Sequence, residues 1–264
     1  FGLYDSIKHV LFLARDRAGE KPLFYFDEGN RFSFASELKA LMAIPGIQKR
    51  LNPLALDCFL AFGYVPGDLC ILNGFNKLKP AHALVYDLDS GKSRAWPYWT
   101  LPEHNAKHCF SNQEEISLLC EFESLLEDSV KRQLVADVPV GVLLSGGIDS
   151  SLTTAMAVRN SCRVKTFTVR FPGHVAYDET HHARLVADYF GTDHVELDAD
   201  VSDVNLLPLL ARQYDEPIID SSMVPTFLVS KLVRKYCTVA LGGDGGDELF
   251  GGYLHYSRLL WLQN

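Results

Sequence analysis

Two glycine-rich segments of this chain combine backbone amides, hydroxyls and carboxylates in a pattern typical of phosphate binding. The first runs from Ser145 to Ser150, after an apolar β-branched run and before a helix-like stretch. A strand that leads through a short Gly-Ser turn into a helix N-terminus offers an anion free N–H groups and the positive end of the helix dipole. Gly146 and Gly147 let the backbone approach phosphate oxygens, and Ser145 and Ser150 add hydroxyl donors. Because Asp149 would repel phosphates unless a cation lay between them, this loop predicts Mg²⁺ with a phosphate ligand.

The second segment, Gly242 to Asp247, repeats this pattern of an apolar strand, glycines with carboxylates, and a helix start. It lacks the ligand spacing of an EF-hand, and the first segment has neither a G-x-x-x-x-G-K-[ST] nor a G-x-G-x-x-G motif. A plain glycine-rich turn is the alternative for each segment taken alone. Two such loops at one edge of a parallel sheet predict instead a Mg²⁺–nucleotide site, in which Asp149 and Asp247 bridge the metal to the phosphates.

Composition and charge exclude several classes of function. The chain has 264 residues, of which 47% are hydrophobic and 22% charged, as expected for a globular protein of one large or two ordinary domains. Its net charge of −8, without a long basic run, argues against a nucleic-acid partner, and no apolar stretch is long enough to span a membrane. Six scattered cysteines without a C-x-x-C pair favour reduced thiols in a cytoplasmic protein. The chain starts without Met inside an apparent strand, and we expect both of its ends to be cut.

The first hundred residues are predicted to be mostly β. Strands are expected at the opening residues and at 9–14, 23–26, 32–35 and 83–88. Helices are expected from about 36 to 42 and from 53 to 62, the second capped by Asn52 with Pro53 in its first turn, and residues 63–80 are expected to be rich in loops. The tract 101–112 is predicted to be an interdomain linker, so we assign His104, His108 and Cys109 to it rather than to a metal site.

From residue 113 onward, strands alternate with helices, which predicts an α/β fold with a doubly wound parallel sheet. A long amphipathic helix is expected at 114–134, with strands at 138–144, 165–171, 194–197 and 238–241. Further helices are expected at about 150–159, 178–190, 204–214 and 224–236. Both glycine-rich loops follow strands, and ligands of such sheets bind beyond the carboxyl ends of the strands.

These segments together resemble the glutamine-dependent asparagine synthetase family. The residues that carry the resemblance are Ser145–Ser150, Gly243–Tyr253, Asp215-Glu216-Pro217 and Asp220-Ser221-Ser222. Upstream, Ala14–Arg17 and Ala35–Leu41 resemble the last part of the family's N-terminal-nucleophile glutaminase domain. The resemblance covers nearly the whole chain. It implies that residues 1–100 are the C-terminal part of that mostly β domain, that 101–112 are a linker, and that 113–264 are the N-terminal part of an ATP pyrophosphatase domain, like that of the adenine nucleotide alpha hydrolases.

The resemblance also implies roles for single residues. The pyrophosphate loop would consist of Ser145, Gly146, Gly147, Asp149 and Ser150. Leu143 and Val169 would line the adenine pocket, and Gly242 and Gly243 would contact the nucleotide. The catalytic carboxylates would be Asp149 and Asp247, which hold the metal, and Asp244, near the acyl-adenylate. The chain departs from the family at Gly242, where a Ser is usual, and a hydroxyl contact to AMP would be lost with that Ser.

The activity implied by the resemblance is ATP-dependent synthesis of asparagine from aspartate through β-aspartyl-AMP, with release of AMP and pyrophosphate. ATP and Mg²⁺ would be the cofactors, aspartate and glutamine or ammonia the substrates, and a homodimer is an open alternative. The family's glutaminase uses an N-terminal cysteine and its synthetase a lysine that would lie beyond Asn264. Because Cys58 is the first cysteine here, we expect the chain to hydrolyse no glutamine. The alternatives are a relative that amidates or cyclises another carboxylate, such as a β-lactam synthetase or a peptide-modifying synthetase, and a nucleotide-binding module without catalysis.

Overall fold

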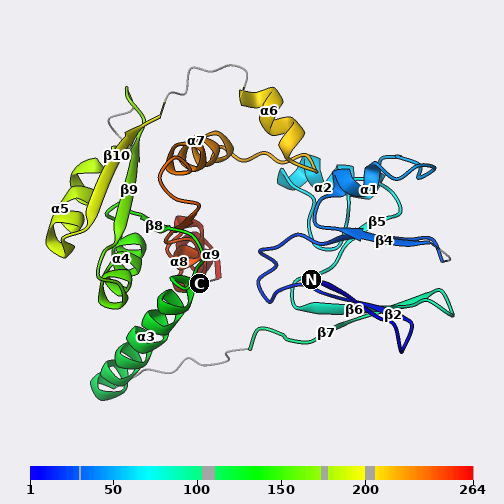
Figure 1. Cartoon of the computed structure of the whole chain (residues 1–264), viewed down its shortest axis with the longest axis horizontal. Helices are drawn as coiled ribbons and strands as arrows, with labels where there is room; N and C mark the ends of the chain where they lie inside the picture. The colour runs from blue at the N-terminus through cyan, green and yellow to red at the C-terminus, as the bar shows by residue number, and fades with distance from the viewer. Residues whose placement is uncertain (30, 103–110, 174–177, 200–205, 264) are drawn as a thin grey trace. The chain divides into compact units, whose positions relative to one another are not determined.

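The computed structural model describes residues 1–29, 31–102, 111–173, 178–199 and 206–263 (Figure 1). These residues form two compact units, one of Phe1–Ala106 with Val204–Ser221 and the other of Lys107–Asp203 with Ser222–Asn264. The expected linker residues His104, His108 and Cys109 lie outside the described residues, as does the start of the helix expected at 204–214. The expected domain boundaries, 1–100 and 113–264 with a linker at 101–112, stay predictions.

The first unit contains two antiparallel sheets, as the β-rich pattern predicts (Figure 1). One has the order β1-β2-β6-β7, made of Gly2–Asp5, Val10–Ala14, His82–Asp87 and Lys92–Pro97. The other has the order β4-β3-β5, made of Phe32–Ala35, Phe24–Asp27 and Phe75–Lys77. Strand β5 falls in the stretch expected to be loop. Its short sequence Phe-Asn-Lys carries no strand pattern of its own and becomes a strand by pairing with β3.

Alternating side chains of β3 face two different cores, because successive residues of a strand point to opposite sides. Tyr25 packs with Leu13 and Leu84 of the four-stranded sheet. Phe24 and Phe26 face the opposite side, in a cluster that includes residues of helices α1 (Leu38–Met42) and α2 (Pro53–Phe62). The three-stranded sheet therefore lies between the four-stranded sheet and a helical layer.

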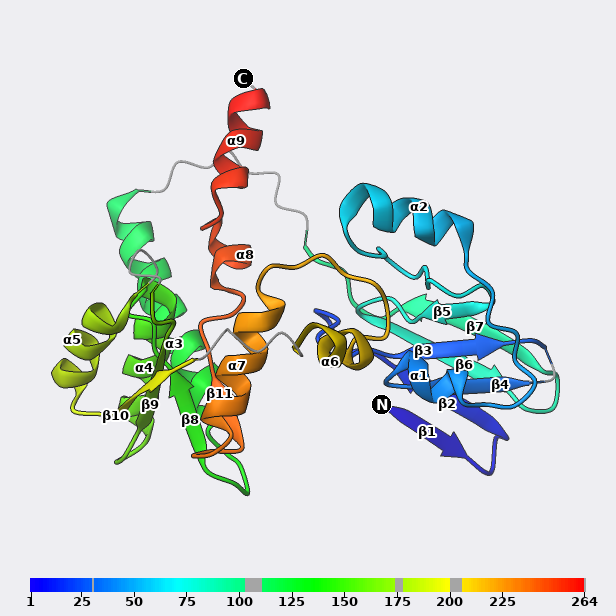
Figure 2. The ribbon, with the colours of Figure 1, turned by 90° about the horizontal axis from the view of Figure 1, so that it is seen from above.

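The second unit is built on a parallel sheet with the order β10-β9-β8-β11 (Figure 2). Its strands are Asp193–Asp198, Lys165–Arg170, Val140–Leu143 and Val239–Leu241. Strand β8 is shorter than the expected 138–144 and begins after Pro139, which has no N–H for a sheet ladder. The helices of this unit are α3 (Asn112–Gln133), α4 (Ile148–Asn160), α5 (Thr180–Phe190), α7 (Met223–Val233), α8 (Gly246–Phe250) and α9 (Leu254–Gln263).

Helices cover both faces of this parallel sheet, which confirms the doubly wound α/β prediction. On one face, Val142 of β8 packs with Val130 of α3 and Met156 of α4. On the other face, Phe167 of β9 packs with Val233 of α7. Among the described residues, no helix is long and apolar enough to cross a membrane.

Helix α3 forms where its amphipathic pattern predicts it, and a reciprocal capping box between Ser111 and Glu114 starts it. Its apolar face is only partly buried, since Val130 is its one fully buried residue while Ile116, Leu119 and Leu125 are exposed. The pattern therefore predicted the helix correctly, while its apolar face is buried only in part.

We predict that removing the Asn52 side chain destabilises the first unit. Asn52 Oδ1 accepts the N–H groups of Leu54 (3.1 Å) and Ala55 (3.4 Å) at the start of α2, as the sequence predicted. Asn52→Ala should lower the free energy of unfolding by about 1 kcal/mol, because the substitution removes the acceptor for these amides. Urea unfolding, with hydrogen exchange of the Leu54 and Ala55 amides, measures the effect. Asn52→Asp keeps an acceptor and is the control; an equal loss in both variants would contradict the capping role.

Candidate functional site

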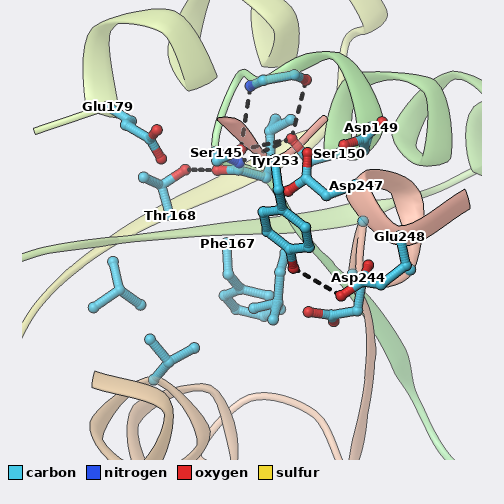
Figure 3. Close-up of a pocket in the computed structure, with 18 residues that line it drawn as sticks. Ser145, Asp149, Ser150, Phe167, Thr168, Glu179, Asp244, Asp247, Glu248 and Tyr253 are labelled. Carbon is cyan, nitrogen blue, oxygen red and sulfur yellow. Dashed lines mark hydrogen bonds between the residues drawn. The ribbon is translucent and has the colours of Figure 1, made fainter. Parts of the chain in front are cut away.

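A cavity of about 400 Å³ lies at the carboxyl ends of β8, β9 and β11 in the second unit (Figure 3). The segments that follow β8 and β11 supply most of its wall, and β9, α7, the residue before α5 and the turn before α9 also contribute to it. Of the site residues predicted from the sequence, those that line the cavity are Leu143, Ser145, Gly147, Asp149, Ser150, Val169, Gly242, Gly243, Asp244 and Asp247. Gly146 lies in the same turn without lining the cavity. The fold thus brings together two segments that are far apart in the sequence.

The hydroxyls of the first loop hold its shape. Ser150 Oγ accepts the N–H of Ser145 (3.2 Å), lies 2.8 Å from Ser145 Oγ, and donates to the Gly147 carbonyl (3.2 Å). Ser145 Oγ in turn accepts the N–H of Gly147 (3.2 Å). Ser150 is buried. The Ser150 hydroxyl therefore stabilises the loop itself. The sequence pattern predicted only that this hydroxyl would bind a ligand.

The loop leads into α4 without a side-chain cap. Gly147 is the N-cap residue and accepts the N–H of Ser151 through its carbonyl (3.0 Å). The N–H groups of the first helical turn have no partner within a helix, so a capping side chain, water or a ligand must satisfy them. Because Gly147 has no side chain, the start of α4 keeps the features of an anion-binding site.

The two loops touch each other through Asp149. A Cβ atom on Gly246 would lie only 2.4 Å from Asp149 Cγ, so glycine is required there for the carboxylate to approach. Thr153 Oγ1 donates to the Asp149 carbonyl (3.0 Å) and to the Gly242 carbonyl (3.4 Å), which joins the backbones of the two loops. Asp149 therefore lies against the residue that precedes Asp247.

Gly242 leaves room for the Asp244 carboxylate. A Cβ atom on Gly242 would lie 2.5 Å from Asp244 Oδ2. A side chain at position 242 would therefore require this acidic side chain of the cavity to move.

The cavity wall carries an excess of negative charge. It contains the five carboxylates Asp149, Glu179, Asp244, Asp247 and Glu248, with Glu179 across the cavity from Asp244 and Glu248 (Figure 3). Within the described part of the chain, no Lys, Arg or His lines it. Arg170, which follows Val169, is held in a bidentate ion pair with Asp198 (2.8 and 3.0 Å). An anionic ligand would therefore bind in this cavity together with a cation, which offsets the repulsion by the carboxylates.

The donor set fits a hard cation such as Mg²⁺, which takes carboxylate, phosphate and water oxygens. Over the described ranges, no group of three or more His, Cys, Asp or Glu side chains could hold a metal by itself. Asp149 and Asp247 would thus provide part of a coordination shell that phosphates and water complete.

The site also contains residues to which the sequence analysis gave no role, among them Thr168, Glu179, Val229, Glu248 and Tyr253. Thr168 lines the cavity and its Oγ1 donates to the Leu144 carbonyl (2.5 Å), while Val229 reaches the cavity from α7. Tyr253 Oη donates to Glu248 (2.7 Å), which lowers the pKa of Glu248 and raises that of Tyr253 to about 12. The Gly-Gly-Tyr end of the second loop pointed to Tyr253, whereas nothing in the local sequence pointed to Val229.

Comparisons with known proteins match both parts of the chain. Residues 1–99 match the glutamine amidotransferase domain, and residues 121–264 match the asparagine synthase family. A candidate glutamine-hydrolysing asparagine synthetase of Methanocaldococcus jannaschii is 38% identical over 259 residues, which cover 96% of this chain and 49% of that protein. Asparagine synthetase [glutamine-hydrolyzing] 1 of Bacillus subtilis is 33% identical over 264 residues, 100% of this chain and 40% of that protein. The chain spans half or less of the length of these relatives.

We predict that Gly146→Ala damages the first loop more than a left-handed glycine elsewhere would. Gly146 has φ +83°, and a Cβ atom would lie 2.6 Å from the backbone of His182 and Ala183. Gly191, at the end of α5, has φ +66° with nothing within 4 Å, so Gly191→Ala is the control for the backbone conformation alone. Gly191→Ala should cost about 1 kcal/mol of unfolding free energy, and Gly146→Ala should cost more because the backbone must also move. Urea unfolding measures both, and equal costs would contradict the close approach.

Proposed function

This chain belongs to the glutamine-dependent asparagine synthetase family, and we propose that the protein makes asparagine by activating the side-chain carboxylate of aspartate with ATP and transferring ammonia to it. The observation that carries the proposal is the meeting of two glycine-rich loops, with Asp149 and Asp247, in one cavity at the carboxyl ends of parallel strands. The similarity of residues 1–99 to a glutamine amidotransferase domain supports glutamine as the source of ammonia. We extend the proposal to a cytoplasmic location; a homodimer stays a prediction.

The cavity suggests how ATP binds. Leu143, Val169 and Val229 belong to one apolar cluster and line the cavity, so they form an apolar surface for adenine. The first turn of α4 offers N–H groups to the phosphates, whereas the N–H groups of Ser145 and Gly147 are donated within the loop. Gly243 of the second loop packs closely on Asp149 and Ser150, which places it near the same phosphates.

Asp149 and Asp247 would hold Mg²⁺ in this arrangement. When bound, the cation supplies charge that offsets the phosphates and stabilises the leaving pyrophosphate. This role fits a wall with five carboxylates and no basic side chain within the described residues.

The proposed reaction has two displacements. An oxygen of the aspartate side chain attacks the α-phosphorus of ATP while the bond to pyrophosphate breaks, which yields an acyl-adenylate. The nitrogen of ammonia then attacks the acyl carbon, and AMP leaves with the bonding electrons. The N–H groups at the start of α4 would stabilise negative charge that develops on the phosphate oxygens, and Asp244 is the proposed acidic group beside the acyl-adenylate.

Oxygen-isotope transfer tests this proposal directly. The protein as its gene encodes it, given aspartate labelled with ¹⁸O in the side-chain carboxylate, ATP, Mg²⁺ and ammonia, should release AMP that carries one ¹⁸O. Unlabelled AMP would contradict attack by the carboxylate. Pyrophosphate release with peptide or β-amino carboxylates, but not with aspartate, would favour the related synthetases instead, and ATP binding without any pyrophosphate release would favour a binding module.

We predict that Asp149→Asn nearly abolishes pyrophosphate release. The substitution keeps the size of the side chain but removes a charged metal ligand, so the loss of transition-state stabilisation should be several kcal/mol, or about a thousandfold in rate. Asp188→Asn, at an exposed position on α5, is the matched control and should keep the wild-type rate. Near-normal pyrophosphate release by Asp149→Asn would contradict the assignment of Asp149.

We also predict that ATP binding depends on a divalent cation. Because the wall holds five carboxylates, removal of Mg²⁺ with EDTA should weaken ATP binding by at least about tenfold, as calorimetry would show. Adenosine carries no phosphates and is the control, since its affinity should not change with EDTA. Equal ATP affinity with and without Mg²⁺ would contradict a metal-bridged site.

A further inference from the structure

Residues 206–221, here called the anchor segment, belong by sequence to the part that matches the asparagine synthase family but pack with the glutaminase-like first unit. The segment contains helix α6 (Leu206–Gln213) and the Asp215-Glu216-Pro217 motif. None of these residues lines the nucleotide cavity. The motif therefore has a task that the proposed site does not explain.

Asp215 caps a helix that is remote in the sequence. Its Oδ2 accepts the N–H of Leu38 (2.7 Å) and its Oδ1 that of Lys39 (3.2 Å), in the first turn of α1. Glu37, the N-cap residue of α1, makes no such side-chain bond. Lys39 Nζ also donates to the Gln213 carbonyl (2.7 Å), so α1 donates three hydrogen bonds to the anchor segment.

Glu216 makes a second attachment through a mostly buried ion pair. Its Oε2 lies 2.7 Å from Lys77 Nζ, with the two side chains 14% and 13% exposed, and its Oε1 accepts the N–H of Ile71 (2.7 Å). Lys77 Nζ also donates to the Val65 carbonyl (2.7 Å). Both charges are thus satisfied, and removal of either would leave a buried charge without its partner.

The Cys70 thiol reports on this attachment. Its pKa is raised to about 12, mainly by burial, and the charge of Glu216 and a hydrogen bond to Glu216 contribute to this rise. Loss of the Glu216 charge should therefore make the thiol more reactive.

We propose that Asp215 and Glu216 are positioning residues that fix the anchor segment to the glutaminase-like unit and thereby couple the use of glutamine to synthesis. The anchor segment continues directly into α7, which supplies Val229 to the nucleotide cavity. The attachment on the first unit and the cavity in the second are thus joined by a short covalent path. The coupling rests on the proposed function, whereas the attachment does not.

The attachment is tested by hydrogen exchange and thiol alkylation in the protein as its gene encodes it. Asp215→Ala should speed exchange of the Leu38 and Lys39 amides by about tenfold or more, because each loses a charged acceptor. Glu216→Gln should speed alkylation of Cys70. Asp68→Asn, which breaks the exposed Lys79–Asp68 pair (3.1 Å, side chains 50% and 53% exposed), is the control and should change neither. Unchanged exchange in Asp215→Ala and unchanged alkylation in Glu216→Gln would overturn the attachment.

A compensating variant keeps the test informative if Glu216→Gln folds poorly. Glu216→Gln leaves the Lys77 ammonium without its partner, so adding Lys77→Met should recover part of the stability that Glu216→Gln loses. Strictly additive losses in the double variant would contradict a direct ion pair.

The coupling is tested by comparing AMP formation with glutamine and with ammonia as nitrogen donor. Asp215→Ala and the double variant Glu216→Gln/Lys77→Met should lower the glutamine-supported rate by about tenfold and keep the ammonia-supported rate within about twofold. An equal fall in both rates would show a merely structural brace, and no fall in either would show an attachment without coupling; each result overturns the coupling. If the wild-type protein forms AMP with neither donor, the proposed function and the coupling both fail, and exchange and alkylation still decide the attachment.

Discussion

The parallel pairing of β8 with β11 is the constraint on which the site depends. The register sets Val239 opposite Val140 and Leu241 opposite Val142, so the two strands end side by side. Because parallel strands present their carboxyl ends at one edge, the glycine-rich loops that follow must meet there. The contact of Asp149 with Gly246 and the bonds of Thr153 to both loops are consequences of this register.

Charge is the second constraint, and it follows from the first. Once the loops meet, their carboxylates share one cavity wall with Glu179 and Glu248, and no basic side chain among the described residues offsets them. A bound cation would stabilise such a group of negative charges. In the proposed function, a nucleotide with Mg²⁺ would satisfy both the N–H groups at the start of α4 and the carboxylates, which a simple anion would not.

Division of the chain into two units does not follow the linear order of the sequence. The anchor segment leaves the α/β part after β10, attaches to the first unit through Asp215 and Glu216, and then continues into α7. A charged dipeptide that would otherwise be solvated is here almost fully satisfied by backbone amides and Lys77. Such specific attachment by polar groups, rather than by an apolar patch, favours one fixed position for the segment.

The sequence by itself determined the strand–helix alternation, most elements of both units, the cap at Asn52, and the loops that carry Asp149 and Asp247, because periodicity, caps and glycine-rich turns are local signals. Tertiary structure alone decided that β5 is a strand, that much of the apolar face of α3 stays exposed, that Ser150 holds its own loop, that Val229 reaches the cavity, and that Asp215 and Glu216 serve the other unit. Strand β5, the place of Val229 and the attachment of Asp215 and Glu216 depend on partners distant in the sequence. The local sequence indicates the conformation of a segment. The groups that form hydrogen bonds with its side chains or bury them are determined only when the whole chain folds.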